Sequence, residues 1–369
     1  MSVETRKIVS VTQQPIRMLI VDDSLLYRKI VRDALDAIPD VEIVASAGDG
    51  VAAIEKIKRY APDLMTLDLE MPRMNGLEVL EQIKTEKLST QAIMISGANR
   101  TDAERTMNAL RRGAFDFIVK PRTDSIEESR QQLIHDLKTR IEAFRAKMQS
   151  ANRPSAPTRS APPSISRSQN FKSAGVINAV GIGISTGGPD ALRKLIPELP
   201  ADFPAPILIV QHMPPMFTKL LADGLNASSA LKVKEAETGD PVQPGHVLIA
   251  PGGKQMKVVS GVDGVQVRVT DDPPENSCRP AVDYLFRSMV PVFGANSLGV
   301  IMTGMGSDGL IGCRELKRAG AKIMVQDEAS CVVFGMPRFP IQERLADEVV
   351  SLPDMATSLQ RTVKRKCFA

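Results

Sequence analysis

The sequence predicts two doubly wound α/β domains, a five-stranded parallel domain and a larger, mostly parallel one, joined by a linker. The chain has 369 residues, 43% of them hydrophobic, which is enough for more than one core. Apolar runs alternate with amphipathic stretches in both halves, and a segment with almost nothing to bury separates them. We expect the first domain over residues 15–140, a helical extension and a Pro/Ser/Ala-rich linker over 141–174, and the second domain over 175–369.

The first domain contains five short apolar runs, each followed by a helical pattern. The runs are Met18–Val21, Val41–Val44, Leu64–Leu67, Ala92–Ile95 and Phe117–Val119. Five such strand and helix pairs are typical of a doubly wound domain with a parallel sheet. In the fifth helix an apolar stripe continues from Leu133 to Met148, further than the covering of a sheet requires. This helix either completes the packing of the domain or serves signalling or dimerisation.

The predicted linker is built mainly from Ser, Ala, Pro, Arg and Asn between Gln149 and Ser173. Its prolines favour a semi-extended chain. No Asp or Glu occurs between Glu142 and Asp190, so this segment is also basic. It is either a solvated spacer or a segment that lies against an acidic surface.

The second domain repeats the alternation of strand and helix patterns. Strands are expected at Val176–Ile184, Pro206–Val210, His246–Ala250, Gln255–Val259, Val265–Val269, Ser297–Met302 and Lys322–Val325. Helices are expected at Pro189–Leu195, Pro280–Met289 and Leu310–Ala319. This order predicts a mostly parallel sheet with an antiparallel excursion around residues 246–270.

Composition disfavours several classes of protein. The net charge is +4, but only 4% of residues are aromatic and Trp is absent, which disfavours a nucleic-acid partner. No two of the four cysteines have the two-residue spacing of a zinc or redox pair, so we expect free thiols in a reducing compartment. No apolar run approaches the roughly 20 residues that span a bilayer, and Met1–Pro15 lacks the core of a secretory signal. We expect a cytoplasmic protein without membrane insertion.

Acidic residues close two strands of the first domain. Asp22 and Asp23 follow the first strand and Asp68 follows the third, and the carboxyl ends of parallel strands meet at one edge of the sheet. Three carboxylates repel one another, and a hard divalent cation, most simply Mg²⁺, relieves the repulsion. Ser96 and Lys120 end the fourth and fifth strands, which adds a hydroxyl and a cation suited to a phosphoryl group. Helix N-caps would explain one acidic pair but not four matched strand ends.

Residues 17–138 resemble the receiver domain of two-component response regulators. The resemblance implies that Asp68 accepts a phosphoryl group from a histidine kinase while Asp22, Asp23 and Asp68 hold Mg²⁺. It implies further roles for three residues at the same edge of the sheet. Lys120 would pair with the phosphoryl oxygens, and Ser96 and Phe117 would form the switch pair that reports phosphorylation.

A glycine-rich segment, Gly181–Asp190, follows the first strand of the second domain and precedes a helix. It does not complete a Gly-x-Gly-x-x-Gly dinucleotide fingerprint, because Thr186 occupies the sixth position and the next strand ends without an acid for a ribose. Gly183–Gly187 instead fits Gly-x-Ser-x-Gly, in which a sharp turn presents a nucleophile, here Ser185, at the top of a sheet. The amino end of the following helix would stabilise an oxyanion there.

A serine nucleophile needs a base, and the chain has three histidines. His212 ends the strand expected beside the strand of the serine, whereas His135 belongs to the first domain and His246 to a turn. Geometry therefore favours His212 as the base. The other interpretation of His212 is a loop histidine that caps the helix after Pro214.

The third member of a serine triad is a carboxylate at another strand end. Asp308 lies in a glycine-rich loop after the strand at Ser297–Met302, where it would orient the histidine and stabilise the imidazolium. It would also be the N-cap of the helix that starts near Leu310, a role compatible with the first. Asp190 is the rival, but its place in a first helical turn suits the helix dipole better.

The strings GISTGGP, QHMP, IAPGG, MTGMGSDG and VVFGMPR follow one another in the second domain. In this order, behind a receiver and a linker, they resemble the chemotaxis protein-glutamate methylesterases. The resemblance implies a phosphorylation-activated hydrolase without a cofactor in its esterase domain. Its substrates would be glutamate methyl esters on the cytoplasmic helices of chemoreceptors, with release of methanol, and receptor glutamines, which it would deamidate.

Ser185, His212 and Asp308 match the triad of this family, and backbone groups of Thr186 and Met305 are our candidates for the oxyanion site. Two further positions differ from many relatives. Cys278 and Gln255 stand where histidine is common, so we expect the rim of the pocket to differ.

Two alternatives to an enzyme follow from the same residues. One is a response regulator whose second domain is a non-catalytic, phosphorylation-gated binding module. The other is a DNA-binding regulator, which the absence of a helix-turn-helix pattern from residues 175–369 disfavours.

Overall fold

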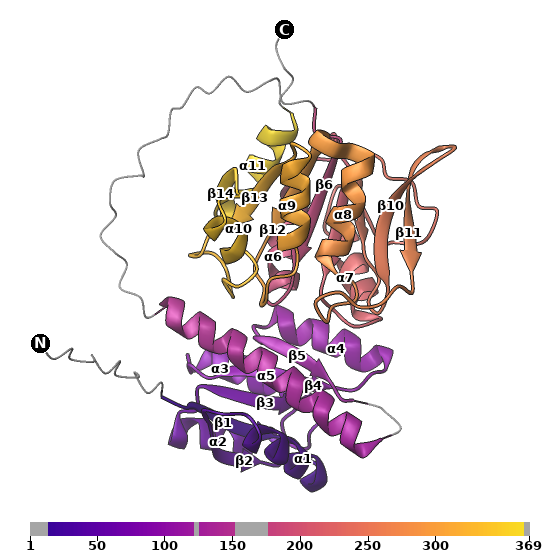
Figure 1. Cartoon of the computed structure of the whole chain (residues 1–369). Coiled ribbons are helices and arrows are strands. Elements are labelled where there is room, and N and C mark those ends of the chain that lie inside the picture. The colour runs from indigo at the N-terminus through magenta and orange to yellow at the C-terminus, as the bar shows by residue number, and fades with distance from the viewer. Residues whose placement is uncertain (1–13, 122–124, 152–175, 365–369) are drawn as a thin grey trace, which may run out of the picture. The chain divides into compact units, whose positions relative to one another are not determined.

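The computed structural model describes residues 14–121, 125–151 and 176–364, which form two compact units (Figure 1). The linker sequence from residue 152 to 174 lies outside the described residues, as do Cys367 and most of Met1–Pro15. Each unit is an α/β layer structure built on its own parallel sheet. The predicted fold class is therefore confirmed.

The first unit contains a five-stranded parallel sheet in the order β2-β1-β3-β4-β5. Its strands are β1 Ile16–Val21, β2 Val41–Ala47, β3 Leu64–Asp68, β4 Gln91–Ser96 and β5 Asp116–Val119. In chain order, the helices between and after these strands are α1 Leu25–Asp36, α2 Gly50–Tyr60, α3 Gly76–Thr85, α4 Arg100–Arg111 and α5 Ile126–Ala151; Arg100–Arg111 and the residues of α5 from Glu142 are counted with the second unit. The fifth helix has 26 residues, so the expectation of a long helix is confirmed.

Polar side chains set where three of these helices begin. Ser24 before α1, Asp49 before α2 and Asn75 before α3 each accept a backbone N–H from the first turn. Such N-caps satisfy donors that the helix itself leaves unpaired. Ser24 directly follows Asp22 and Asp23, so this cap also fixes the loop that carries these acidic side chains.

The second unit contains a seven-stranded sheet in the order β14-β13-β12-β6-β7-β9-β8, and all six pairings are parallel. The strands are β6 Ala179–Ile184, β7 Ile207–Gln211, β8 Lys232–Glu235, β9 His246–Ile249, β12 Ser297–Ile301, β13 Lys322–Gln326 and β14 Glu348–Val350. The helices are α6 Gly188–Leu195, α7 Phe217–Asn226, α8 Val282–Phe293, α9 Leu310–Arg318, α10 Arg338–Gln342 and α11 Leu352–Val363, with short 3₁₀ turns η1 Ile196–Glu198 and η2 Gly294–Asn296.

The predicted antiparallel excursion is shorter than expected. Residues 246–249 form a parallel strand of the main sheet, and only β10 Gln255–Gly261 and β11 Gly264–Thr270 pair antiparallel, in a separate hairpin. The sequence patterns also missed β8 and β14, the two edge strands. These strands have only four and three residues, as edge strands are often short, and therefore carry little periodic signal.

Helices α8 and α9 lie side by side over one face of the seven-stranded sheet (Figure 1). Alternate glycines in β6 permit this close approach. A Cβ atom on Gly183 would lie 2.4 Å from Val282, and one on Gly181 would lie 2.7 Å from the sulfur of Met289, both residues of α8. These glycines therefore serve helix packing, and this close contact places the amino end of α8 near the carboxyl end of β6.

Candidate functional site

Three neighbouring strands bring the predicted triad residues to one edge of the second sheet. β6 lies between β12 and β7, and Ile184 at the end of β6 pairs with Gln211 at the end of β7. Ser185 and His212 are the next residues on the two strands, and the His212 N–H donates to the carbonyl of Ile184 at 3.2 Å. The Ser185 N–H donates to the carbonyl of Thr303, which follows β12, at 3.0 Å.

His212 is oriented by Asp308. The ring Nε2 lies 2.8 Å from Asp308 Oδ2, so Nε2–H donates to the carboxylate and Nδ1 is left as the basic nitrogen. Asp308 is held in turn by backbone N–H groups at the start of α8, from Val282 at 2.7 Å and from Asp283 at 3.1 Å. The carboxylate therefore lies at the positive end of a helix dipole.

The expectation that Asp308 is the N-cap of α9 is wrong. The N-cap of that helix is Gly309, and no side chain accepts a cap hydrogen bond there. Asp308 accepts the Gly309 N–H at 3.0 Å but directs both oxygens toward α8. The cause is tertiary, because the capped helix begins 26 residues earlier in the chain.

Charge and burial act in opposite directions on this pair. Burial favours a neutral carboxyl, but the hydrogen bond and charge of His212 and the N–H groups of α8 outweigh it and lower the pKa of Asp308. Burial likewise disfavours the imidazolium, but Asp308 and the sulfur of Cys278 outweigh it and raise the pKa of His212. Asp308 thus stabilises the charge that His212 gains when it accepts a proton.

Ser185 occupies a tight turn between β6 and α6. Its carbonyl accepts the Gly188 N–H at 2.8 Å and the side-chain amide of Gln211 at 3.0 Å, and Gly187 has a φ of 79°. Within the described part of the chain, no hydrogen bond joins Ser185 Oγ to His212. Catalytic hydrogen bonds of this kind often form only when substrate is bound.

The loop after β12 packs directly against the serine. A Cβ atom on Gly304 would lie 2.7 Å from the Cβ of Ser185 and 3.1 Å from its backbone nitrogen. Met305 follows Gly304 and Thr186 follows Ser185, so both residues are next to this close contact. This arrangement suits the backbone N–H groups of both residues as candidates for the oxyanion site, which stays a prediction.

We predict that Gly304→Ala lowers ester hydrolysis by about 10²-fold, because the new methyl group must displace Ser185 by a sizeable fraction of an ångström. The measurement is kcat for methanol release, with a thermal unfolding curve to monitor the fold. Gly261→Ala, at the exposed last residue of β10, is the control and should leave kcat near the wild-type value. Equal kcat values for the two variants would show that the close contact does not position Ser185.

Two residues around the triad hold it in place in ways that the sequence analysis did not predict. Asn276 donates to Asp308 at 3.2 Å and to Asp283 at 2.9 Å. Gln255, expected at the pocket rim, is instead fully buried. Its amide donates to the carbonyl of Pro273 at 3.0 Å and its carbonyl accepts the Ala281 N–H at 2.9 Å, so it braces the loop before α8. No local sequence pattern predicts such contacts between distant segments.

The acidic residues of the first unit also converge. Lys120 Nζ lies 2.8 Å from Asp68 Oδ1 and 3.3 Å from Asp22 Oδ2. Asp23 is exposed beside them, and its carbonyl accepts a hydrogen bond from Arg28 at 3.0 Å. Burial raises the pKa of Asp68 to about 6, Lys120 opposes this shift, and Asp22 and Asp23 add to it. A bound cation would relieve this unfavourable charge, and an all-oxygen donor set fits Mg²⁺.

The two switch candidates lie on the adjacent strands. Ser96 is buried at the end of β4, where its carbonyl accepts the Lys120 N–H at 2.7 Å. Phe117 is buried in β5 and pairs with Met94. Tyr27 was not predicted, yet Lys120 Nζ lies 4.4 Å from the centre of its ring. Its phenol is buried, and burial together with the charges of Asp22 and Asp68 raises its pKa.

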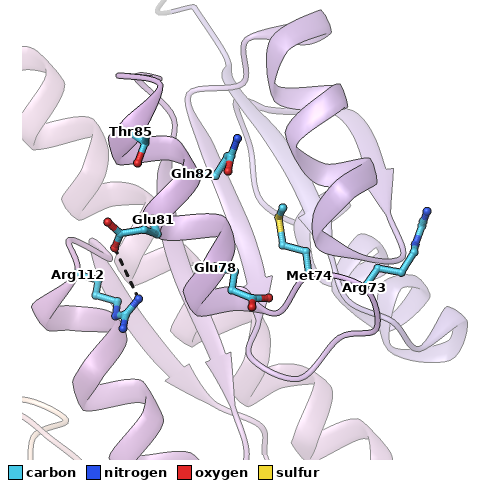
Figure 2. A pocket seen from close by; sticks show the side chains of 7 residues that line it. All are labelled: Arg73, Met74, Glu78, Glu81, Gln82, Thr85 and Arg112. Carbon is cyan, nitrogen blue, oxygen red and sulfur yellow. Dashed lines mark ion pairs between the residues drawn. The ribbon is translucent and has the colours of Figure 1, made fainter.

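A surface pocket of about 410 Å³ lies along α3 (Figure 2). It is lined by Arg73, Met74, Glu78, Glu81, Gln82, Thr85 and Arg112. Arg112 pairs with Glu81 at 3.6 Å, and Arg73 pairs with Asp49. Because its guanidinium groups already pair with carboxylates of the protein, this pocket does not suggest a chemical function.

Relatives match almost the whole chain. A protein of Desulfotalea psychrophila named protein-glutamate methylesterase/protein-glutamine glutaminase is 45% identical over 359 residues, covering 95% of this chain and 99% of the relative. One of Burkholderia lata, protein-glutamate methylesterase/protein-glutamine glutaminase 3, is 42% identical over 352 residues, covering 93% and 94%. The crystal structure of the Thermotoga maritima CheB methylesterase catalytic domain is 42% identical, covers 50% of this chain and 97% of its own, and has a TM-score of 0.49.

The two folds and their strand-end residues define a response regulator with a hydrolase-type second domain. Residues 18–130 match the response regulator receiver domain, and residues 180–359 match CheB methylesterase. The chain therefore belongs to the CheB methylesterase family, and the resemblance found in the sequence is confirmed. Among the described helices, none is both long and apolar enough to cross a membrane.

Proposed function

We propose that this chain is a phosphorylation-activated hydrolase that removes methyl esters from glutamate side chains of chemoreceptors and deamidates receptor glutamines. Relatives that match 93% or more of the chain carry the names of this activity, which supports the proposal. The strongest support is the geometry of the strand ends: Ser185 and His212 follow paired residues of neighbouring strands, and Asp308 accepts the His212 Nε2–H at 2.8 Å. A phosphorylation-gated binding module would need neither this carboxylate nor its helix cap. The enzyme is therefore favoured over the binding module.

In the proposed mechanism, Ser185 Oγ attacks the ester carbonyl while His212 Nδ1 takes the hydroxyl proton. The imidazolium, stabilised by Asp308, gives this proton to the departing methoxide, and methanol leaves. Water then attacks the acyl-enzyme with the same base, which releases the glutamate carboxyl and restores Ser185. The N–H groups of Thr186 and Met305 stabilise the oxyanion in both steps. This chemistry needs no cofactor in the second domain.

The receiver supplies control in this proposal. Asp68 takes a phosphoryl group from a histidine kinase. Asp22, Asp23 and Asp68 would hold Mg²⁺, which would supply neutralisation of the charge on the transferred group. Lys120 then pairs with the phosphoryl oxygens, while Ser96 and Phe117 rearrange. We retain residues 15–140 and 175–369 as the two domains.

The partners follow from the substrates. They are methylated receptor helices and the kinase, without nucleic acid, and we place the enzyme in the cytoplasm, where both partners are accessible.

We predict that a small phosphodonor with Mg²⁺ raises methanol release by the wild-type chain about 5–150-fold, the usual range of coupling between two sites. Asp68→Asn should abolish this increase, because the amide cannot form the acyl phosphate. Asp33→Asn, at an exposed position of α1, is the matched control and should respond like the wild type. The measurement is methanol release from methylated receptor with and without phosphodonor. A full response in Asp68→Asn would exclude Asp68 as the acceptor.

A further inference from the structure

The basic nitrogen of the proposed catalytic histidine faces a thiol. Cys278 Sγ lies 3.8 Å from His212 Nδ1, the nitrogen that Asp308 leaves unoccupied. His212, Cys278 and Asp308 each offer one ligand atom, and these three atoms lie within 4.8 Å of one another. Sulfur and imidazole nitrogen are the donors that Zn²⁺ prefers, so this cluster differs in kind from the all-oxygen cluster around Asp68.

The spacing of the two donors fits one tetrahedral zinc ion. Zinc bonds of about 2.3 Å to sulfur and about 2.0–2.1 Å to nitrogen place the two donor atoms about 3.6 Å apart in a tetrahedron. The observed separation of Sγ and Nδ1 is 3.8 Å. An ion could therefore bind between them with a small adjustment of one side chain. Binding would release the thiol proton to solvent and leave two positions for water.

Asp308 completes the arrangement as a partner of the histidine. Its oxygens already accept N–H groups from Val282, Asp283 and Gly309, as well as the side-chain amide of Asn276. These bonds occupy the carboxylate and leave it as the acceptor of His212 Nε2–H at 2.8 Å. A metal-bound histidine usually donates its second N–H to a carboxylate, which fixes the ring and increases its basicity.

The backbone around Cys278 is also held in place. The Cys278 N–H donates to the carbonyl of Glu275 at 2.7 Å, and the Glu275 N–H donates to the carbonyl of Cys278 at 3.0 Å. The buried amide of Gln255 contacts the same Cys278 carbonyl at 3.4 Å. Cys278 is only half-buried, so the segment that carries the thiol borders solvent.

We infer that His212 and Cys278 form a binding site for a thiophilic divalent cation, of the class of Zn²⁺, and that the bound ion inhibits the enzyme. The ion takes the Nδ1 lone pair, so His212 can no longer accept the proton of Ser185. The inhibition rests on the proposed function, whereas the binding does not. The chain thus carries two cation sites of opposite chemistry, a hard site that supports phosphorylation and a soft site that blocks hydrolysis.

Cobalt binding tests the site without an activity assay. Co²⁺ occupies zinc sites, and its bond to a thiolate gives a charge-transfer absorption in the near ultraviolet that oxygen ligands do not give. We expect one equivalent of Co²⁺ to produce this band in the full chain with excess Mg²⁺ present, and Zn²⁺ to remove it. Cys278→Ser should lack the band, and Cys331→Ser, which alters another half-buried thiol, should keep it. A band that persists in Cys278→Ser, or none in the wild type, overturns the site.

Inhibition is tested on the same three proteins, with methanol release as the readout. The rate of each protein is expressed relative to its own rate in the presence of a chelator. Zn²⁺ should inhibit the wild type and Cys331→Ser reversibly, and Cys278→Ser should need at least about tenfold more Zn²⁺. Equal sensitivity of all three proteins overturns the inhibitory role. If Cys278→Ser does not fold, the site is tested in the wild type by alkylation of Cys278. Bound Zn²⁺ should then protect the thiol, and a rate of alkylation that Zn²⁺ does not change overturns the site. If the proposed function is wrong, the wild type should show no hydrolysis even with a chelator present, but the cobalt band should remain.

Discussion

Replacing Ser185 with alanine should lower methanol release from methylated receptor by about 10³-fold or more, with little effect on the fold. The loss is large because the hydroxyl is the attacking group and neither His212 nor the oxyanion donors can replace it. The side chain itself makes no hydrogen bond among the described residues. Its turn is held through the Ser185 carbonyl, which accepts the Gly188 N–H and the side-chain amide of Gln211. Stability should therefore change by less than about 1 kcal/mol.

Ser307→Ala is the matched control for this experiment. Ser307 lies exposed in the glycine-rich loop between Met305 and Asp308, so its hydroxyl is close to the site but outside the proposed chemistry. The control should retain the wild-type rate and the same thermal midpoint. Near-normal methanol release by Ser185→Ala would exclude the serine as nucleophile and would turn attention to the other nucleophilic side chain beside His212, Cys278.

Periodicity and strand-end chemistry predict most of what positions the two sites. Each apolar run forms a strand, and in a parallel sheet the residues that follow neighbouring strands lie at one edge, so the sequence alone is enough to place Ser185 beside His212. The same logic places Asp22, Asp68 and Lys120 in one cluster. These predictions succeed because they depend on local pattern and on the geometry of one sheet.

The missed features depend on contacts between distant segments. The carboxylate of Asp308 caps α8, which begins 26 residues earlier, and no short-range signal distinguishes this from a cap on the helix that follows it. Cys278 and His212 are 66 residues apart, so their spacing resembles no metal motif. Gln255 has the polarity of a surface residue, but its amide satisfies backbone groups that would otherwise be buried unpaired.

His212→Gln should also lower methanol release by about 10³-fold or more, and the double variant with Ser185→Ala should be no slower than the slower single variant. The reason is that the base acts only through the serine hydroxyl, so once either group is gone the other has nothing left to contribute. Two independent contributions would instead multiply to a loss of about 10⁶-fold.

The measurement is kcat/KM for the wild type, both single variants and the double variant. His246→Gln, at the start of β9, is the matched control because it removes the other histidine of the second domain, and it should keep the wild-type rate. A multiplicative loss in the double variant would falsify the assignment of Ser185 and His212 to one catalytic unit, because it would require His212 to stabilise the transition state by a route that bypasses Ser185.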